Sequence, residues 1–125
     1  MKKERNLQFR LKDSDGKKYT LEVEVPSGSE TADFLREIQE DHGLMQSVWE
    51  WIYDGWEVNG EVSVSPLMIA ATLEKEAHGY RSEGRDTKNY DKEHRFHARE
   101  HAGLLQNLAS RIAFLEAKRI KNIQV

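Results

Sequence analysis

The chain has 125 residues, 38% of them hydrophobic and 33% charged, with a formal net charge of −3 at pH 7 and no cysteine. This length favours one domain, and the lack of cysteine excludes disulfides and thiolate zinc sites. No apolar run nears the roughly 20 residues that cross a bilayer, so we expect a cytoplasmic protein without membrane contact. The chain also lacks the basic excess of a nucleic-acid binder, so we expect no direct nucleic-acid contact.

Residues 6–25 are predicted to form an antiparallel β-hairpin, because apolar and polar side chains alternate in two runs on either side of a turn. The apolar face would hold Leu7, Phe9 and Leu11 from the first run and Tyr19, Leu21, Val23 and Val25 from the second. Aligning the two faces, with Leu11 opposite Tyr19, requires a loop with an odd number of residues. The sequence therefore predicts a three-residue loop that ends at Gly16, with this glycine in a left-handed conformation.

The segment over residues 29–55 is acidic, rich in aromatic residues and helical in its spacing. Residues 26–64 hold one arginine against nine aspartates and glutamates. A capping box runs from Ser27 to Glu30, Thr31 is a competing cap one turn further in, and Gly43 is well placed to end a first helix. Helical spacing then resumes, so two short helices and one kinked helix fit equally well.

Large aromatic rings gather near the end of this segment, too many for one helix face to bury. They could complete the core above the hairpin, or they could anchor an interface. As an interface, rings beside acidic residues would suit a basic protein partner. The predicted partner-binding residues are Trp49, Glu50, Trp51, Tyr53, Asp54 and Trp56.

Residues 56–64 combine a turn signal with a short strand that could extend the sheet to three strands. Ser65 and Pro66 mark the start of the next helix, with the serine as its N-cap and the proline in its first turn. The apolar spacing predicts a helix over residues 66–78. The polar stretch 79–90 begins with a glycine and is predicted to be a loop between two antiparallel helices.

A long helix over residues 91–121 is the element on which the rest of the chain is expected to pack. Steps of three and four residues place on one seam His94, Ala98, His101, Leu105, Leu108, Ile112, Leu115 and Arg119. At about 1.5 Å per residue the helix would run roughly 45 Å, longer than so small a domain needs. We therefore expect a homodimer. The predicted self-association residues are Leu105, Leu108, Ile112 and Leu115.

Histidines on this helix form the pattern that most suggests catalytic chemistry. His97 to His101 spells H-x-x-E-H, which resembles the inverted zinc-protease motif, in which two histidines bind zinc and the glutamate acts as base. That motif needs a further acidic ligand on another helix, whereas Glu116 is the sole carboxylate after His101 and lies on the same helix. Packing or pH-sensitive histidines are the alternative. The predicted ligands of a divalent metal are His78, His94, His97 and His101.

These features predict an α+β fold, in which an N-terminal antiparallel β-hairpin of two or three strands packs on helices and a C-terminal antiparallel helix pair ends in one long helix. We expect binding rather than enzymatic activity, with no cofactor. The predicted function is that of a small protein-binding or regulatory module, which self-associates through its last helix and presents an acidic, tryptophan-rich surface to a protein partner. The alternative is a metal-binding protein or metal-dependent hydrolase built on the histidines.

Overall fold

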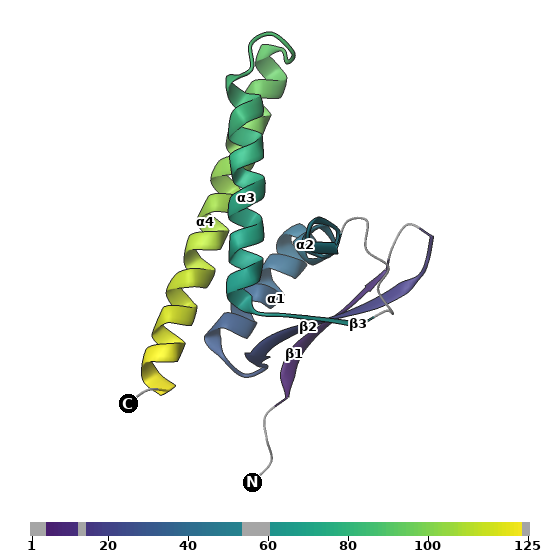
Figure 1. Cartoon of the computed structure of the whole chain (residues 1–125), viewed down its shortest axis with the longest axis vertical. Coiled ribbons are helices and arrows are strands. Elements are labelled where there is room, and N and C mark those ends of the chain that lie inside the picture. Colours follow the sequence, from purple (N-terminus) through teal and green to yellow (C-terminus); the bar gives the residue numbers. More distant parts are fainter. Residues whose placement is uncertain (1–4, 13–14, 54–60, 124–125) are drawn as a thin grey trace.

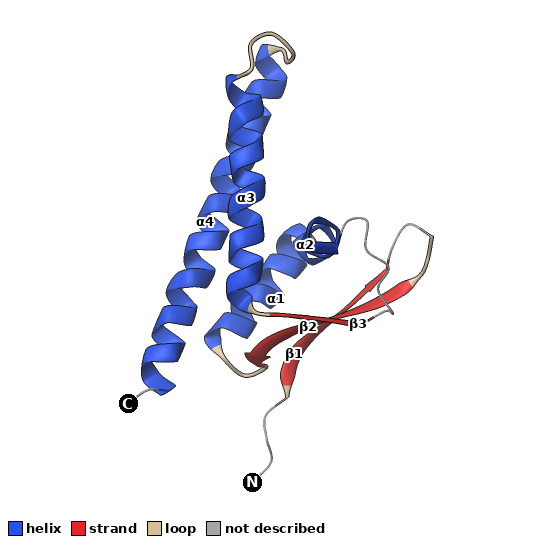
Figure 2. Cartoon of the chain, viewed as in Figure 1, coloured by secondary structure: helices blue, strands red, loops and turns tan. Residues whose placement is uncertain are grey.

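The computed structural model describes residues 5–12, 15–53 and 61–123 and shows the predicted α+β fold. A three-stranded sheet and two short helices, α1 (Glu30–His42) and α2 (Leu44–Tyr53), form what we call the body. A long helical hairpin packs against the body and projects beyond it (Figure 1). Figure 2 shows that the strands gather at one end of the molecule, with the helical hairpin extending away from them.

The strands β1 (Asn6–Lys12) and β2 (Lys18–Pro26) form the predicted antiparallel hairpin. The predicted register is confirmed, with Leu7 opposite Val23, Phe9 opposite Leu21 and Leu11 opposite Tyr19. Gly16 has a φ of 83°, which confirms its left-handed conformation. Residues 13 and 14, which include the start of the predicted loop, lie outside the described residues.

The third strand, β3 (Glu61–Val64), pairs with β2 in parallel, and the strand order is β1-β2-β3. The sheet is therefore mixed, and antiparallel pairing is confirmed only for the hairpin. The reason lies in the connection. A tight turn reverses the chain, whereas a helical crossover, supplied here by α1 and α2, allows the next strand to run in the same direction.

The core lies on one face of the sheet, because alternation along the strands sends apolar side chains to that face and polar ones to the other. The body helices and the base of the helical hairpin cover it. The buried core includes Leu7, Phe9, Leu11, Leu21, Val23, Val25, Leu35, Ile38, Met45, Val48, Ile69, Leu73, Leu105 and Ile112.

Gly43 separates α1 from α2, so the chain forms two helices rather than one kinked helix. Its φ of 61° is left-handed, and its N–H donates to the Gln39 carbonyl at 2.9 Å. At the other end of α1, the Ser29 hydroxyl accepts a hydrogen bond from the Ala32 N–H at 3.1 Å. The N-cap is therefore Ser29, two residues after the serine that begins the predicted capping box, and Thr31, the competing candidate, is buried within the first turn.

The helix α3 (Pro66–Arg85) begins as predicted, with the Ser65 hydroxyl accepting from the Met68 N–H at 3.1 Å. Its predicted end before Gly79 is wrong. This glycine lacks the left-handed backbone that ends a helix, and the helix continues for six further residues. The reason is tertiary packing, because Tyr80 contacts the last helix and Gly84 is buried against it. The polar loop is therefore shorter than predicted and covers residues 86–91.

The last helix, α4 (Lys92–Ile123), matches the predicted long helix within two residues at each end and pairs with α3. The core cluster reaches Ala77 on α3 and Ala102 on α4. We call the part of the hairpin beyond these residues, 78–101, the arm, and the rest of α3 and α4 the base. Figure 1 shows the arm extending away from the sheet. Within the described ranges, no helix combines the length and the apolarity that crossing a bilayer requires.

Candidate functional site

An open hollow of about 540 Å³ lies on one flank of the arm, and we call it the histidine hollow. Both helices of the hairpin line it, with Tyr80 and Glu83 from α3 and His94, His97, Ala98, Glu100, His101 and Leu104 from α4. Three of the four predicted metal-binding histidines are thus brought together. The fourth, His78, is exposed on α3 and is not among these lining residues.

Two histidines of the hollow bridge the two helices. The Nε2 atom of His94 lies 3.1 Å from Oε2 of Glu83, and its ring stacks on Tyr90 with the ring centroids 4.2 Å apart. His101 meets the Tyr80 ring edge-on, at 4.6 Å between centroids. These contacts hold the rings along the junction of α3 and α4.

The histidines do not converge on a common metal position. In residues 5–12, 15–53 and 61–123, no group of three or more His, Cys, Asp or Glu side chains is arranged to hold a metal ion. Each imidazole has a different neighbour: His94 contacts Glu83, His101 contacts Tyr80, and His97 lies 3.9 Å from Glu93. The resemblance to the zinc-protease motif therefore finds no assembled ligand set in the described part of the chain.

The tip of the arm is tied together by hydrogen bonds. Asp86 accepts from the backbone N–H groups of Lys88 and Asn89, each at 3.1 Å, and from the Asn89 side chain at 2.8 Å. The side-chain bond from Asn89 is the main cause that lowers the pKa of Asp86. Asp91 then accepts from the His94 N–H at 2.8 Å, which satisfies a free donor in the first turn of α4.

Close packing of the two helices also fixes the arm below its tip. The Arg99 guanidinium donates to the Gly84 carbonyl at 3.0 Å. A Cβ atom at Gly84 would lie 2.5 Å from Cγ of Arg99, so the helices approach closely here because this position has no side chain.

The predicted tryptophan surface is only partly assembled. Trp49 is 5% exposed, and its ring packs against Tyr19 with the centroids 4.6 Å apart, so it belongs to the core rather than to an interface. Trp51 is half-buried against the core, and Glu50 is exposed. The Tyr53 side chain, Asp54 and Trp56 lie outside the described residues.

The predicted self-association seam lies inside the single chain. Leu105 and Ile112 are 0% exposed and Leu115 is 4% exposed, while Leu108 packs half-buried against the core. Pairing two chains through these side chains would require α3 and α1, which pack against α4, to move away from it. The seam is therefore corrected to an intramolecular contact, because the chain itself covers it.

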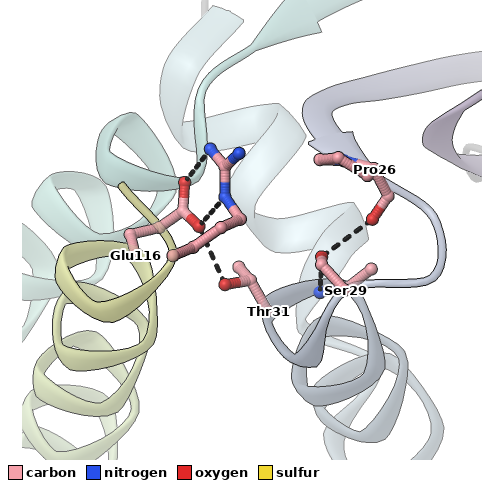
Figure 3. Close-up of polar contacts among 6 residues, drawn as sticks. Pro26, Ser29, Thr31 and Glu116 are labelled. Atoms are coloured by element: carbon pink, nitrogen blue, oxygen red, sulfur yellow. Dashed lines mark hydrogen bonds and ion pairs between the residues drawn. The ribbon is translucent and has the colours of Figure 1, made fainter. Parts of the chain in front are cut away.

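A buried polar network that the sequence analysis missed ties α4 to α1 (Figure 3). Glu116 is 2% exposed and accepts from the Thr31 hydroxyl at 2.8 Å. Arg119 donates to both oxygens of the same carboxylate, at 2.7 and 2.9 Å. The available signal was the position of Glu116, which directly follows Leu115 and therefore lies beside the apolar seam, where a charged side chain needs an internal partner.

The electrostatics of this network favour a charged Glu116. Burial raises the pKa of the Glu116 carboxyl, but the hydrogen bonds from Arg119 and Thr31 outweigh burial and hold its pKa below the ordinary value. The same bond raises the pKa of Arg119. Because every partner is internal, the network stabilises the fold and we assign it no binding role.

Among the described residues, we take the histidine hollow as the candidate binding surface. Its rings and its Leu104 side chain can pack against apolar groups, and its carboxylates can pair with cations of another molecule. Comparisons with known proteins add no assignment: no protein-family model matches the chain, and neither a curated protein nor a solved structure shows significant similarity to it.

Proposed function

We propose that the protein is a binding module that holds a partner protein against its projecting arm. One observation carries this proposal: residues 78–101 extend beyond the core cluster, yet hydrogen bonds at the tip and close packing at Gly84 hold them in place. Ordering a backbone costs roughly 1–2 kcal/mol per residue. A long ordered segment that adds little to the core is better explained by contact with another molecule.

The histidine hollow is the part of the arm best suited to that contact. It is open on one side and lined by both aromatic and polar groups, as protein interfaces are, whereas small-molecule pockets bury most of their ligand. Phe96 adds an apolar ring nearby on the arm and is 50% exposed. We place the protein in the cytosol, because a chain without cysteine needs no oxidising compartment.

Site-specific photocrosslinking in the native host tests the proposal. A photoreactive residue is placed at His97 or Glu100, which are exposed at the hollow, or at Lys12 or Glu24, which are exposed on the body. We expect discrete crosslinked species from the two arm positions and none from the body positions. Crosslinks from the body positions alone, or from no position, would contradict a partner-binding arm.

A further inference from the structure

We propose that the occupant of the histidine hollow is an amphipathic helix of the partner protein, with an apolar stripe and basic flanks. This inference rests on the proposed binding role of the arm. The partner helix would lie along the groove between α3 and α4 in the arm. There it would take the place beside α4 that α1 occupies at the base.

The seam on α4 continues from the base into the arm. At the base, Leu105 and Ile112 are fully buried, and α1 lies against α4, joined to it by the buried bond from Thr31 to Glu116. One turn above Leu105, His101 is half-buried and lines the open hollow. The same helical face therefore has a third helix beside it at the base and an open surface in the arm.

The floor of the histidine hollow has a shape and chemistry that suit a third helix. Tyr80, His101 and Leu104 form a half-buried floor from two antiparallel helices. Side chains three and four residues apart on adjoining helices form ridges and grooves, into which another helix packs at an interaxial distance of about 8–10 Å. A helix with an apolar stripe can cover this floor without either hairpin helix moving.

The charged groups of the hollow favour a basic occupant. The described residues that line it include the carboxylates of Glu100 and of Glu83, which contacts His94, and no lysine or arginine. Glu93 lies beside His97 at the edge of the same flank. Carboxylates around an apolar floor favour a partner with Lys or Arg beside its apolar stripe, and they disfavour an acidic one.

The test uses the full chain and two synthetic peptides of roughly 20 residues, about 30 Å of helix. Both have leucines at helical spacing; one has lysines and the other glutamates at the remaining positions. Fluorescence anisotropy of the labelled peptides should show at least about tenfold tighter binding of the lysine peptide. Equal affinities for both peptides would contradict the charge argument.

Two matched pairs of variants locate the site. Glu100→Lys should weaken binding of the lysine peptide about tenfold, whereas Glu37→Lys, a reversal at an exposed position on acidic α1, should change it less than about twofold. Leu104→Ser should weaken it, whereas Phe114→Ser, at a ring 58% exposed outside the hollow, should not. If Glu37→Lys or Phe114→Ser weakened peptide binding while Glu100→Lys and Leu104→Ser did not, the assignment to the hollow would be overturned.

Light scattering and the crosslinking experiment separate the remaining outcomes. A dimer of the full chain that dissociates on Leu104→Ser would make a second copy the occupant and would contradict the partner helix. If arm crosslinks form but the lysine peptide does not bind, the binding role of the arm stands and the inferred helix is wrong. If both are absent, the proposed function fails as well.

Discussion

Two stretches of α4 share one helical pattern of side chains but differ in whether the chain buries them. At the base of α4, Leu105 and Ile112 are fully buried within the chain and belong to the core. In the arm, His94 is exposed and His101 is half-buried on the same seam, and both line the hollow. Periodicity tells which side chains share a face, but not whether the chain itself covers that face.

The largest expected difference is between two adjacent leucines, one in the core and one at the hollow. Leu105→Ala should lower the free energy of unfolding by about 2–5 kcal/mol, because it leaves a cavity in the core. Leu104→Ala, at a half-buried position beside the hollow, should lower it by less than about 1 kcal/mol. Urea denaturation of both variants measures the difference. Similar losses would mean that the hollow is covered as the core is.

The next effect concerns the polar link between the base of α4 and α1. Thr31→Val removes the hydroxyl that donates to the buried Glu116 carboxylate and should lower stability by about 1–3 kcal/mol. Thr72→Val is the control, because the Thr72 hydroxyl donates to the Met68 carbonyl within an exposed turn of α3. Thermal and urea unfolding compare the two variants, and an equal effect would show that the buried bond has no special weight.

The same network predicts an acid dependence of stability. The pKa of Glu116 is lower in the folded chain than its ordinary value, so its contribution is fully present above the unfolded pKa and is lost as pH falls through the folded pKa. Unfolding measured from pH 7 down to pH 3 should therefore show a smaller stability loss in Glu116→Gln than in the natural chain. Equal acid losses would contradict a charged, hydrogen-bonded Glu116.

Two glycines of the arm give opposite expected effects. Gly84→Ala would place its methyl group against Arg99 and should lower stability by about 1–3 kcal/mol through overpacking. Gly79→Ala meets no atom within 4 Å of the added carbon and should raise stability by roughly 0.5–1 kcal/mol, since alanine is the better helix former. Thermal unfolding tests both. Loss of stability in both variants would indicate that α3 does not continue through residue 79 as described.

The smallest effect is expected at the junction of the arm helices. His94→Ala removes the contact with Glu83 and should change global stability by less than about 1 kcal/mol, because both side chains are partly exposed. Amide exchange near the tip should nevertheless become faster, while exchange in the sheet stays unchanged. A large global loss would place His94 in the core, contrary to its exposure.

Local chemistry made part of the fold predictable. The hairpin register follows from strict alternation at Leu11 and Tyr19, and Gly43 and Ser65 mark helix ends through hydrogen bonds that involve only neighbouring residues. Such features depend on a few adjacent side chains. They are therefore visible in the sequence without knowledge of the tertiary structure.

Features that depend on distant segments were not predictable in the same way. The continuation of α3 past Gly79 depends on packing of Tyr80 and Gly84 against α4, and the parallel β3 depends on a crossover. The histidine spacing indicated a shared flank correctly, since three imidazoles line one hollow. It could not indicate the partners from α3 and the tip, such as Glu83 and Tyr90, that keep those rings apart.

Amide hydrogen exchange of the full chain with and without the lysine-leucine peptide tests most directly whether the arm is the binding surface. The account predicts slower exchange in residues 78–101 when the peptide is present, with no change in β1 and β2. Protection confined to α1 and α2, or no protection in the arm at saturating peptide, would contradict it.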